Sequence, residues 1–231
     1  MSTRRLSSAS IPAESTASSL LAAQSLRGRV LKRGGDIVFS LLVLGLGSPL
    51  FLLLAVLVKL SSRGSVFYCQ RRIGRGYKGF GCLKFRTMRR DADRVLAAML
   101  EADPKLRAEF ERDHKLKRDP RITPLGKFLR RSSLDELPQF INVLRGEMSV
   151  VGPRPIVWDE LRRYGRNMDE VLSVRPGLTG LWQVSGRNNL TYRTRVRLDL
   201  TYVRNRSFWL DLGIVLRTIG VVLLPMDRGA Y

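Results

Sequence analysis

An uncharged apolar run constrains the fold of this chain more than any other feature of its sequence. The run covers residues 37–60 (IVFSLLVLGLGSPLFLLLAVLVKL), and Lys59 is its one charged residue. A helix of this length spans a hydrocarbon core of about 30 Å. A buried core helix is the alternative, but a soluble domain of this size rarely surrounds so long an apolar helix. We therefore predict a membrane-inserted segment.

The middle of the apolar run contains the residues of a helix break. Gly45, Gly47, Ser48 and Pro49 lie together there. Proline removes a backbone donor and clashes with the preceding turn, so a helix bends or breaks at this point. The hydroxyl of Ser48 can bond a carbonyl that the break frees, which lets the break persist in lipid. We therefore expect two helical halves rather than one straight helix.

Basic residues flank the apolar run on both sides. They are Arg27, Arg29, Lys32 and Arg33 before it and Arg63, Arg71, Arg72 and Arg75 after it. The positive-inside tendency places both flanks on the cytoplasmic side of a membrane. A helix–break–helix hairpin that enters and leaves by one face satisfies this tendency, whereas a straight span does not. The sequence therefore favours a re-entrant membrane hairpin over residues 31–62.

The charge balance and the rare residue types restrict the function classes. The 231 residues carry a formal charge of +21, which predicts attraction to nucleic acid, anionic lipid or phosphorylated substrates without choosing among them. Cys69 and Cys82 make no disulfide framework, and we expect reduced, packed thiols. The single histidine, His114, lies among charged residues, which makes a zinc site of the usual ligands and a Ser-His-Asp triad poor candidates.

The rest of the chain predicts an α+β fold that is mostly helical. Residues 1–30 are rich in Ser, Ala and Thr and are expected to form a disordered tail. Residues 63–231 are expected to form one cytoplasmic catalytic domain. Within it, Ser65–Gln70 and Gly79–Met88 have the composition of strands, and the glycine-rich turn between them predicts a small β-hairpin.

Several helices follow in the predicted domain. Residues 91–100 and 106–116 have apolar residues at helical spacing and heavy charge. They fit amphipathic helices on a membrane surface and, equally, a solvated helix pair packed on a core. Two more helices are expected at residues 136–144 and 210–224, whereas residues 151–155 and 175–180 are rich in turn residues.

The segment RRSSLDELPQF, residues 130–140, holds the best candidates for chemistry. Pro138 lacks an N–H and suits the first turn of a helix, which predicts a helix start near Asp135 and Glu136. Free backbone N–H groups and the positive end of the helix dipole would then converge on this acidic pair. Such an end binds phosphate and keeps a carboxylate ionised, and Arg130 and Arg131 just upstream would strengthen both effects.

The residues alone leave two interpretations of this acidic pair open. In the first, Asp135 is a helix N-cap and Glu136 is a first-turn acid that suits the dipole. In the second, Asp135 is a nucleophile that attacks a phosphoryl centre and forms an aspartyl-phosphate type of intermediate. Phosphoryl transfer depends on positioning and charge neutralisation, for which the surplus of Arg and Lys would be useful.

Four motifs carry a resemblance to a known family. They are KFRTM (residues 84–88), SLDELPQ (133–139), GEMSVVGPRP (146–155) and RPGLTGLWQVSGR (175–187). From about Lys32 to its C-terminus the chain resembles the bacterial sugar transferase family, the monotopic polyprenyl-phosphate phosphoglycosyltransferases. It is most similar to short exopolysaccharide-initiating members that transfer galactose-1-phosphate, including the ending at Arg228–Tyr231.

The resemblance implies a reaction. Asp135 would attack the β-phosphate of a UDP-sugar and release UMP, and undecaprenyl phosphate would then take up the phosphosugar. Glu136 would assist by holding Mg²⁺ or by orienting a phosphate. Asp199 would be a metal ligand or would support one, with an ordinary acid on a helix surface as the alternative. The break of the family's re-entrant helix maps onto Ser48 and Pro49.

The resemblance also implies substrate contacts. Lys84 and Arg86 would contact phosphate, with a pair of surface cations beside the membrane as the alternative. Arg130 would bind the polyprenyl phosphate or the departing phosphate. Arg154 lies between two stiffening prolines and would contact the nucleotide, unless it pairs with an acid such as Asp159. Gln183 and Arg187 would line the nucleotide pocket.

Two rival functions remain for comparison. The charge favours a membrane-tethered nucleic-acid-binding protein, but the chain has no recognition helix or zinc module, and its aromatics are not interleaved with the basic runs. An inactive scaffold for polysaccharide assembly is less favoured, because the Asp135–Glu136 pair is intact.

We therefore expect a UDP-sugar, undecaprenyl phosphate and anionic lipid as partners, no nucleic acid, and a location on the cytoplasmic face of a bacterial inner membrane. The choice between galactose and glucose, and a homodimer through the amphipathic helices, stay open.

Overall fold

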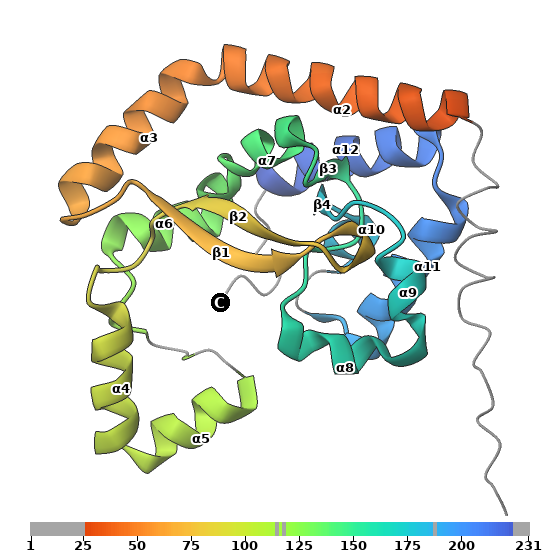
Figure 1. The fold of residues 1–231 in the computed structure, drawn as a ribbon. Helices are drawn as coiled ribbons and strands as arrows, with labels where there is room; N and C mark the ends of the chain where they lie inside the picture. The colour runs from red at the N-terminus through yellow and green to blue at the C-terminus, as the bar shows by residue number, and fades with distance from the viewer. Residues whose placement is uncertain (1–25, 114–115, 117–118, 187–188, 224–231) are drawn as a thin grey trace, which may run out of the picture.

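The computed structural model describes residues 26–113, 116, 119–186 and 189–223 (Figure 1). These residues form a mostly helical α+β structure, as the sequence predicts, with two pairs of short strands. Most of the predicted tail, His114, Arg187 and the ending at residues 228–231 lie outside the described residues. Helix α2 begins at Leu26, so regular structure starts before the predicted tail boundary at residue 30.

The apolar run forms a bent pair of helices, α2 (Leu26–Leu46) and α3 (Ser48–Ser61). In Figure 1 the pair forms an elbow along one side of the molecule. The helices bend by 65° at Gly47, Pro49 lies in the first turn of α3, and the Ser48 hydroxyl donates to Gly45 O over 2.8 Å. The predicted break at Ser48 and Pro49 is therefore confirmed. No single helix among the described residues has the length and hydropathy to cross a membrane, whereas this bent pair does.

The predicted β-hairpin is confirmed. Strand β1 (Phe67–Ile73) pairs antiparallel with β2 (Gly79–Phe85), with Phe67 opposite Phe85 and Ile73 opposite Gly79. The connecting turn contains a short 3₁₀ helix, η1 (Arg75–Tyr77). Both cysteines are free; Cys82 is buried as expected, whereas Cys69 is exposed, so the prediction of packed thiols is wrong for Cys69. Whether a cysteine of this hairpin is covered depends on what packs over it, and the composition of the segment does not reveal that.

A second strand pair was not predicted. Strands β3 (Ser149–Val151) and β4 (Gly177–Thr179) pair in parallel, within segments whose Gly and Pro content indicates turns. Each strand has only three residues, too few for a period-two pattern to show. A Cβ on Gly177 would lie 2.1 Å from Gly152 N, so the two backbones can approach this closely only because glycine is present.

The remaining helices surround these strands. They are α4 (Ala92–Ala102), α5 (Pro104–Asp113), α6 (Pro124–Ser132), α7 (Gln139–Arg145), α8 (Leu161–Tyr164), α9 (Met168–Val171), α10 (Leu181–Ser185), α11 (Tyr192–Asn205) and α12 (Phe208–Leu223), with 3₁₀ helices η2 (Leu134–Glu136), η3 (Trp158–Glu160) and η4 (Gly165–Asn167). The predicted helices near residues 91–100, 106–116 and 210–224 correspond to α4, α5 and α12. Helices α6 and α11 were not predicted, because their many basic residues obscure the apolar pattern.

The two halves of the bent pair are held by different kinds of contact. One face of α3 buries Leu54 and Val58 against Phe85 and Leu129, while its other face exposes large apolar side chains such as Leu52 and Leu60. Burial of such side chains stabilises the packed state by about 1.5–3 kcal/mol each. Helix α3 is therefore attached to β2 and α6 by apolar packing.

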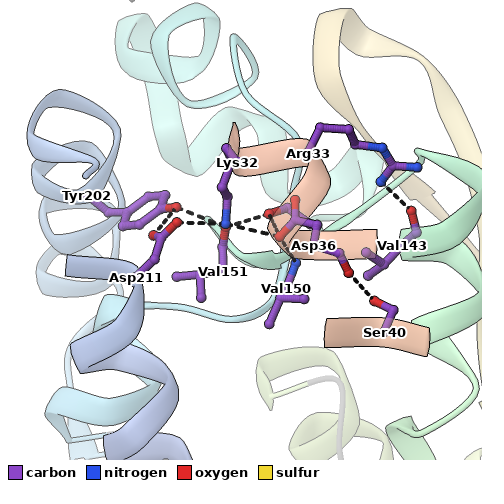
Figure 2. A network of polar contacts seen from close by, with 10 residues as sticks. Lys32, Arg33, Asp36, Ser40, Val143, Val150, Val151, Tyr202 and Asp211 are labelled. Atoms are coloured by element: carbon purple, nitrogen blue, oxygen red, sulfur yellow. Dashed lines mark hydrogen bonds and ion pairs between the residues drawn. The ribbon is translucent and has the colours of Figure 1, made fainter. Parts of the chain in front are cut away.

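Helix α2 packs Phe39 against Phe140 and is attached in addition by a buried polar network (Figure 2). Lys32 Nζ lies 3.2 Å from Asp36 Oδ1 and 2.7 Å from Asp211 Oδ2, on α12. Asp36 Oδ1 also accepts from Ser149 Oγ and Val150 N of β3, each over 3.1 Å. Arg33 donates to Val143 O and Leu144 O, two carbonyls at the end of α7. Helix α2 is thus fixed to β3, α7 and α12 at once.

Candidate active site

The acidic pair lies in a tight connection between α6 and α7. Ser133 ends α6 in a left-handed conformation (φ 58°), and the 3₁₀ helix η2 then carries Asp135 and Glu136. Helix α7 begins at Gln139, after Pro138, so the predicted helix start at Asp135 is wrong. Pro138 has no N–H to donate, and the preceding residues make i→i+3 bonds instead, as in Leu137 N to Leu134 O. Asp135 is therefore not the N-cap of α7.

Asp135 is a buried carboxyl group with a perturbed acidity. Asp135 is only 8% exposed to solvent. Burial and the neighbouring charge of Glu136 raise its pKa to about 6, although the charges of Lys84 and Arg130 oppose this rise. At neutral pH this carboxylate is still ionised, yet its negative charge is poorly stabilised by the protein. A carboxylate in this state is suited to react with an electrophile or to bind a cation.

Lys84 and Glu136 form an ion pair beside Asp135. Lys84 Nζ donates to Glu136 Oε1 over 2.6 Å. Burial tends to raise the pKa of Glu136, but the charge and hydrogen bond of Lys84, with help from Arg154, hold it below its usual value. Burial likewise disfavours the charged lysine, and the two carboxylates outweigh it and raise the pKa of Lys84. The predicted phosphate contact Lys84 therefore lies at the candidate site, paired with Glu136 and in electrostatic interaction with Asp135.

The position of Lys84 depends on Asn142, a residue that sequence analysis missed. Its side chain accepts from Leu83 N over 2.9 Å and donates to Gly81 O over 2.8 Å, which fixes α7 against β2. Asn142 is fully buried, and α7 directly follows the acidic pair. No clear signal in the sequence points to it, because Asn142 lies off the apolar face of the predicted helix, and only the fold shows that this buried amide has partners.

Three arginines supply positive charge around the acidic pair. Arg130 Nε donates to Thr87 Oγ1 over 2.9 Å, and its charge lowers the pKa of Asp135. Arg154 and Arg72 both lower the pKa of Glu136. Arg130 and Arg154 therefore lie at the predicted site, whereas Arg72 was expected only as a basic flank of the membrane segment.

Arg72 and Arg154 belong to one arrangement. Arg72 is buried and donates to Pro155 O over 3.1 Å, next to Arg154 in the loop after β3. The Arg154 guanidinium lies over the ring of Trp182, 5.8 Å from the ring centre. These contacts hold the loop in place, and the predicted alternative pairing of Arg154 with Asp159 is not among the ion pairs of the described residues. Strand pairing brings Arg72 here, which no local sequence pattern indicates.

The other predicted site residues have different surroundings. Arg86 donates to Ser62 O over 2.6 Å, at the end of α3, rather than to the acidic pair. Gln183, next to Trp182, donates to Leu178 O over 3.2 Å. Asp199 is buried, accepts from the Tyr164 hydroxyl over 3.1 Å and has a pKa raised to about 7 by burial, so it is not an ordinary surface acid. Its charge interacts with Arg154.

The donor set can be tested against Mg²⁺. The described residues contain no group of three or more His, Cys, Asp or Glu side chains that could hold a metal ion. Mg²⁺, however, is usually bound through one or two carboxylates together with waters and substrate phosphates. Asp135 and Glu136 offer two such carboxylates, and their mutual repulsion, seen in the raised pKa of Asp135, is relieved by a cation. This pair therefore fits a magnesium ion that a bound diphosphate helps to hold.

Comparison with known proteins agrees with the four motifs. The model of the bacterial sugar transferase family matches residues 27–225. The chain is 56% identical over 206 residues to an uncharacterized sugar transferase of Haemophilus influenzae, covering 89% of this chain and 43% of that protein. It is 52% identical over 204 residues to the exopolysaccharide production protein ExoY of Rhizobium meliloti, covering 88% and 89%. It is 52% identical over 203 residues to an undecaprenyl-phosphate galactose phosphotransferase of Salmonella typhimurium, covering 88% and 42%.

A buried acidic pair with one lysine and three arginines around it is an arrangement suited to phosphate chemistry. The family match covers most of the chain, and the relatives are well above the identity at which families diverge in fold. The chain belongs to the bacterial sugar transferase family. It spans less than half of the Haemophilus and Salmonella relatives and most of the Rhizobium one.

Proposed function

We propose that this chain transfers a sugar-1-phosphate, galactose-1-phosphate in the first instance, from a UDP-sugar to undecaprenyl phosphate. The observation that carries the proposal is the buried Asp135 carboxylate, with its pKa raised to about 6, next to the Lys84–Glu136 pair. The printed name of the Salmonella relative supplies the lipid acceptor and the galactose, and the name of the Rhizobium relative supplies the link to exopolysaccharide.

The reaction proceeds in two displacements at one phosphorus atom. A carboxylate oxygen of Asp135 attacks the β-phosphorus of the UDP-sugar, the bond to the α-phosphate oxygen breaks, and UMP leaves. A phosphate oxygen of undecaprenyl phosphate then attacks the same phosphorus and displaces Asp135. The product is a diphosphate-linked lipid, and the carboxylate is regenerated.

The cations around Asp135 have separate roles in these steps. Lys84 and Arg130 neutralise charge that develops on the transferred phosphoryl group and the leaving group. Arg154, held against Trp182 in its loop, contacts the nucleotide phosphates, and Gln183 lines the nucleotide pocket. Glu136 orients Lys84 and provides a carboxylate oxygen for Mg²⁺, which when bound would neutralise the diphosphate. Asp199 acts through Arg154 rather than on the metal directly.

Membrane attachment is part of the same proposal. The bent pair α2–α3 inserts as a re-entrant hairpin over residues 31–62, and residues 63–231 lie on the cytoplasmic face of the inner membrane. The 65° bend, the exposed apolar side chains of both helices and the basic flanks support this arrangement. Helices α4 and α5 lie on the membrane surface as amphipathic helices.

An assay with purified protein tests the reaction. The protein in detergent is incubated with undecaprenyl phosphate, Mg²⁺ and, separately, UDP-galactose and UDP-glucose, and UMP is measured. We expect UMP with UDP-galactose, and none from an Asp135→Asn variant, whereas an Asp93→Asn variant, changed at an exposed acid of α4, keeps full activity. UMP from neither sugar refutes the transfer.

A labelling experiment tests the topology. Single cysteines replace Arg29 and Arg63 in a Cys69→Ser background, because Cys69 is exposed and would react itself. A membrane-impermeant maleimide is added to spheroplasts and to inverted vesicles. The hairpin predicts that both positions react only in inverted vesicles, and reaction of the two positions from opposite faces would rule it out.

A further inference from the structure

An open pocket of about 500 Å³ lies where α3 ends, apart from the acidic pair. Its size is within the range of sites that bind small ligands. Three segments line it, namely residues 61–63 at the end of α3, residues 89–91 before α4, and residues 120 and 122–124 up to the start of α6. The pocket thus lies at the exit of the proposed membrane hairpin.

The lining of this exit pocket is strongly cationic. Arg63, Arg89 and Arg90 line it, and Asp91 is the one acid among its lining residues. Arg89 Nε pairs with Asp91 over 3.3 Å, whereas Arg63 and Arg90 form no ion pair with any residue that the structure describes. The first residues of α6 also line the pocket, and the dipole of this helix adds positive potential there.

A fourth guanidinium, that of Arg86, lies behind the pocket wall. It donates to Ser62 O over 2.6 Å, and its buried Nε has no acceptor among the described residues. Gly64 (φ 125°) permits this packing, because a Cβ there would lie 2.5 Å from Arg86 Nη1. Burial and the charge of Arg90 lower the pKa of Arg86, which shows that these cations repel one another. An anion in the pocket would relieve that repulsion.

The exit pocket and the acidic pair lie at opposite ends of α6. Thr123 and Pro124, which line the pocket, begin the helix, whereas Asp135 follows its C-terminal end. Nine residues of α-helix are about 13 Å long at a rise of ~1.5 Å per residue. One phosphate group cannot therefore contact both sites, and an anion in the exit pocket is not the one that Asp135 would attack.

The surface next to the pocket is apolar. Helix α3 exposes Val56, Leu57 and Leu60 in the turns that lead to Ser61. A ligand that has an anionic phosphate and long hydrocarbon chains matches both surfaces together. Undecaprenyl phosphate has this chemistry too, but its phosphate must reach Asp135 in order to react. A phospholipid has no such requirement.

We propose that the exit pocket binds the phosphodiester headgroup of an anionic phospholipid, whose acyl chains lie along the exposed face of α3. The inference rests on the membrane insertion in the proposed function, and it assigns Arg86, Arg63 and Arg90 to lipid rather than to the UDP-sugar. The bound lipid holds the C-terminal end of the hairpin at the level of the headgroups.

Native mass spectrometry of the full chain in detergent, with phosphatidylglycerol as the probe, tests the proposal. We expect one tightly bound phosphatidylglycerol per chain. An Arg63→Gln, Arg90→Gln double variant should bind it about thirtyfold more weakly, since two cations are removed from the headgroup. An Arg162→Gln, Arg197→Gln double variant, which loses two exposed cations outside the pocket, should bind it as the unchanged chain does.

Two outcomes would overturn the exit pocket as a phospholipid site. One is equal binding by both double variants, with the fold of each checked by circular dichroism. The other is stoichiometric displacement of phosphatidylglycerol by undecaprenyl phosphate, which would assign the pocket to the acceptor. Because binding needs no turnover, a chain that binds phosphatidylglycerol but releases no UMP would refute only the proposed transfer.

Discussion

In two places in this molecule one lysine lies close to two carboxylates, and the two clusters differ in how those carboxylates are satisfied. In the anchor cluster, Lys32 lies between Asp36 and Asp211, and β3 and Tyr202 supply further hydrogen bonds (Figure 2). In the site cluster, Lys84 pairs with Glu136, while the buried Asp135 receives much weaker support. The same three charges can thus fix a helix or leave one carboxylate reactive.

The difference lies in hydrogen bonding rather than in charge. A single oxygen of Asp36, Oδ1, accepts hydrogen bonds from Ser149 Oγ and Val150 N and also pairs with Lys32. Buried charges are stable when such bonds replace their hydration. The raised pKa of Asp135 means that its burial and the charge of Glu136 outweigh its backbone hydrogen bond and the neighbouring cations. Stability is therefore concentrated at the anchor, and reactivity at the site.

The largest expected effect is on catalysis. Asp135→Asn should lower transfer by about a thousandfold or more, because the amide cannot act as the nucleophile. Asp36→Asn, in the anchor cluster, should lower transfer only in proportion to the loss of folded protein. Initial rates of UMP release per folded molecule distinguish the two. Equal specific activities of the two variants would remove the distinction between the clusters.

Removal of an anchor carboxylate should have the largest effect on stability. Asp36→Ala leaves Lys32 with one partner and Val150 N without an acceptor, so we expect a loss of about 3–5 kcal/mol of unfolding free energy. The matched control is Asp93→Ala on α4, which should change it by less than about 0.5 kcal/mol. Thermal unfolding in detergent measures both. An anchor variant as stable as its control would show that apolar packing alone holds α2.

At the site cluster the same kind of change should act in the opposite direction. The folded pKa of Asp135, about 6, lies above the ordinary value of 3.8, so ionisation of Asp135 destabilises the folded state. Protonated Asp135 makes its full contribution to the unfolding free energy below pH 3.8, and this contribution is lost as the pH rises through about 6. Asp135→Asn should therefore raise the unfolding free energy by up to about 3 kcal/mol at pH 7.5.

The pH dependence of that gain is the check. Because native Asp135 is protonated at pH 4.5, the advantage of Asp135→Asn should be small there and should grow as the pH rises to 7.5. Thermal unfolding of both proteins across this range measures it. A variant that is less stable than the unchanged chain at pH 7.5 would mean that Asp135 is stabilised by its surroundings.

A smaller effect is expected on the pH profile of transfer. Attack requires ionised Asp135, so the rate should fall as the pH drops below about 6. Lys84→Met removes a charge that lowers the pKa of both carboxylates, so the acidic limb should move to higher pH. Lys32→Met in the anchor should reduce stability and leave this limb in place. If the acidic limb of the pH–rate profile is the same in the Lys84→Met variant, Lys84 does not affect the pKa of the reacting carboxylate.

Local sequence patterns predicted those parts of the fold that depend on local chemistry. The break at Ser48 and Pro49, the hairpin around the glycine-rich turn and the helices near residues 91–113 follow from residues close together in the chain. The parallel pair β3–β4 did not, because three-residue strands joined by a long crossover show no periodicity. The predicted start of α7 was wrong because Pro138 is compatible with two arrangements. It can lie in the first turn of a helix, or it can directly precede the helix after a 3₁₀ turn, as it does here.

The site could be predicted only where a residue's neighbours in sequence are also its neighbours in space. Asp135, Glu136 and Arg130 meet that condition. Lys84 and Arg154 were assigned through family motifs, and the fold brings them to the acidic pair. Arg72 and Asn142 escaped notice, since strand pairing and the docking of α7 on β2 decide their roles. Arg86 was expected at a phosphate of the substrate, and in the structure it donates to Ser62 O near the end of α3.

The covalent role of Asp135 is the central claim, and peptide mass spectrometry tests it most directly. The protein is incubated with UDP-galactose and Mg²⁺ without acceptor, quenched and digested with protease. We predict that the peptide containing Asp135 gains the mass of one hexose phosphate, and that undecaprenyl phosphate removes it. Release of UMP without an adduct, or an adduct on any other residue, would contradict the account.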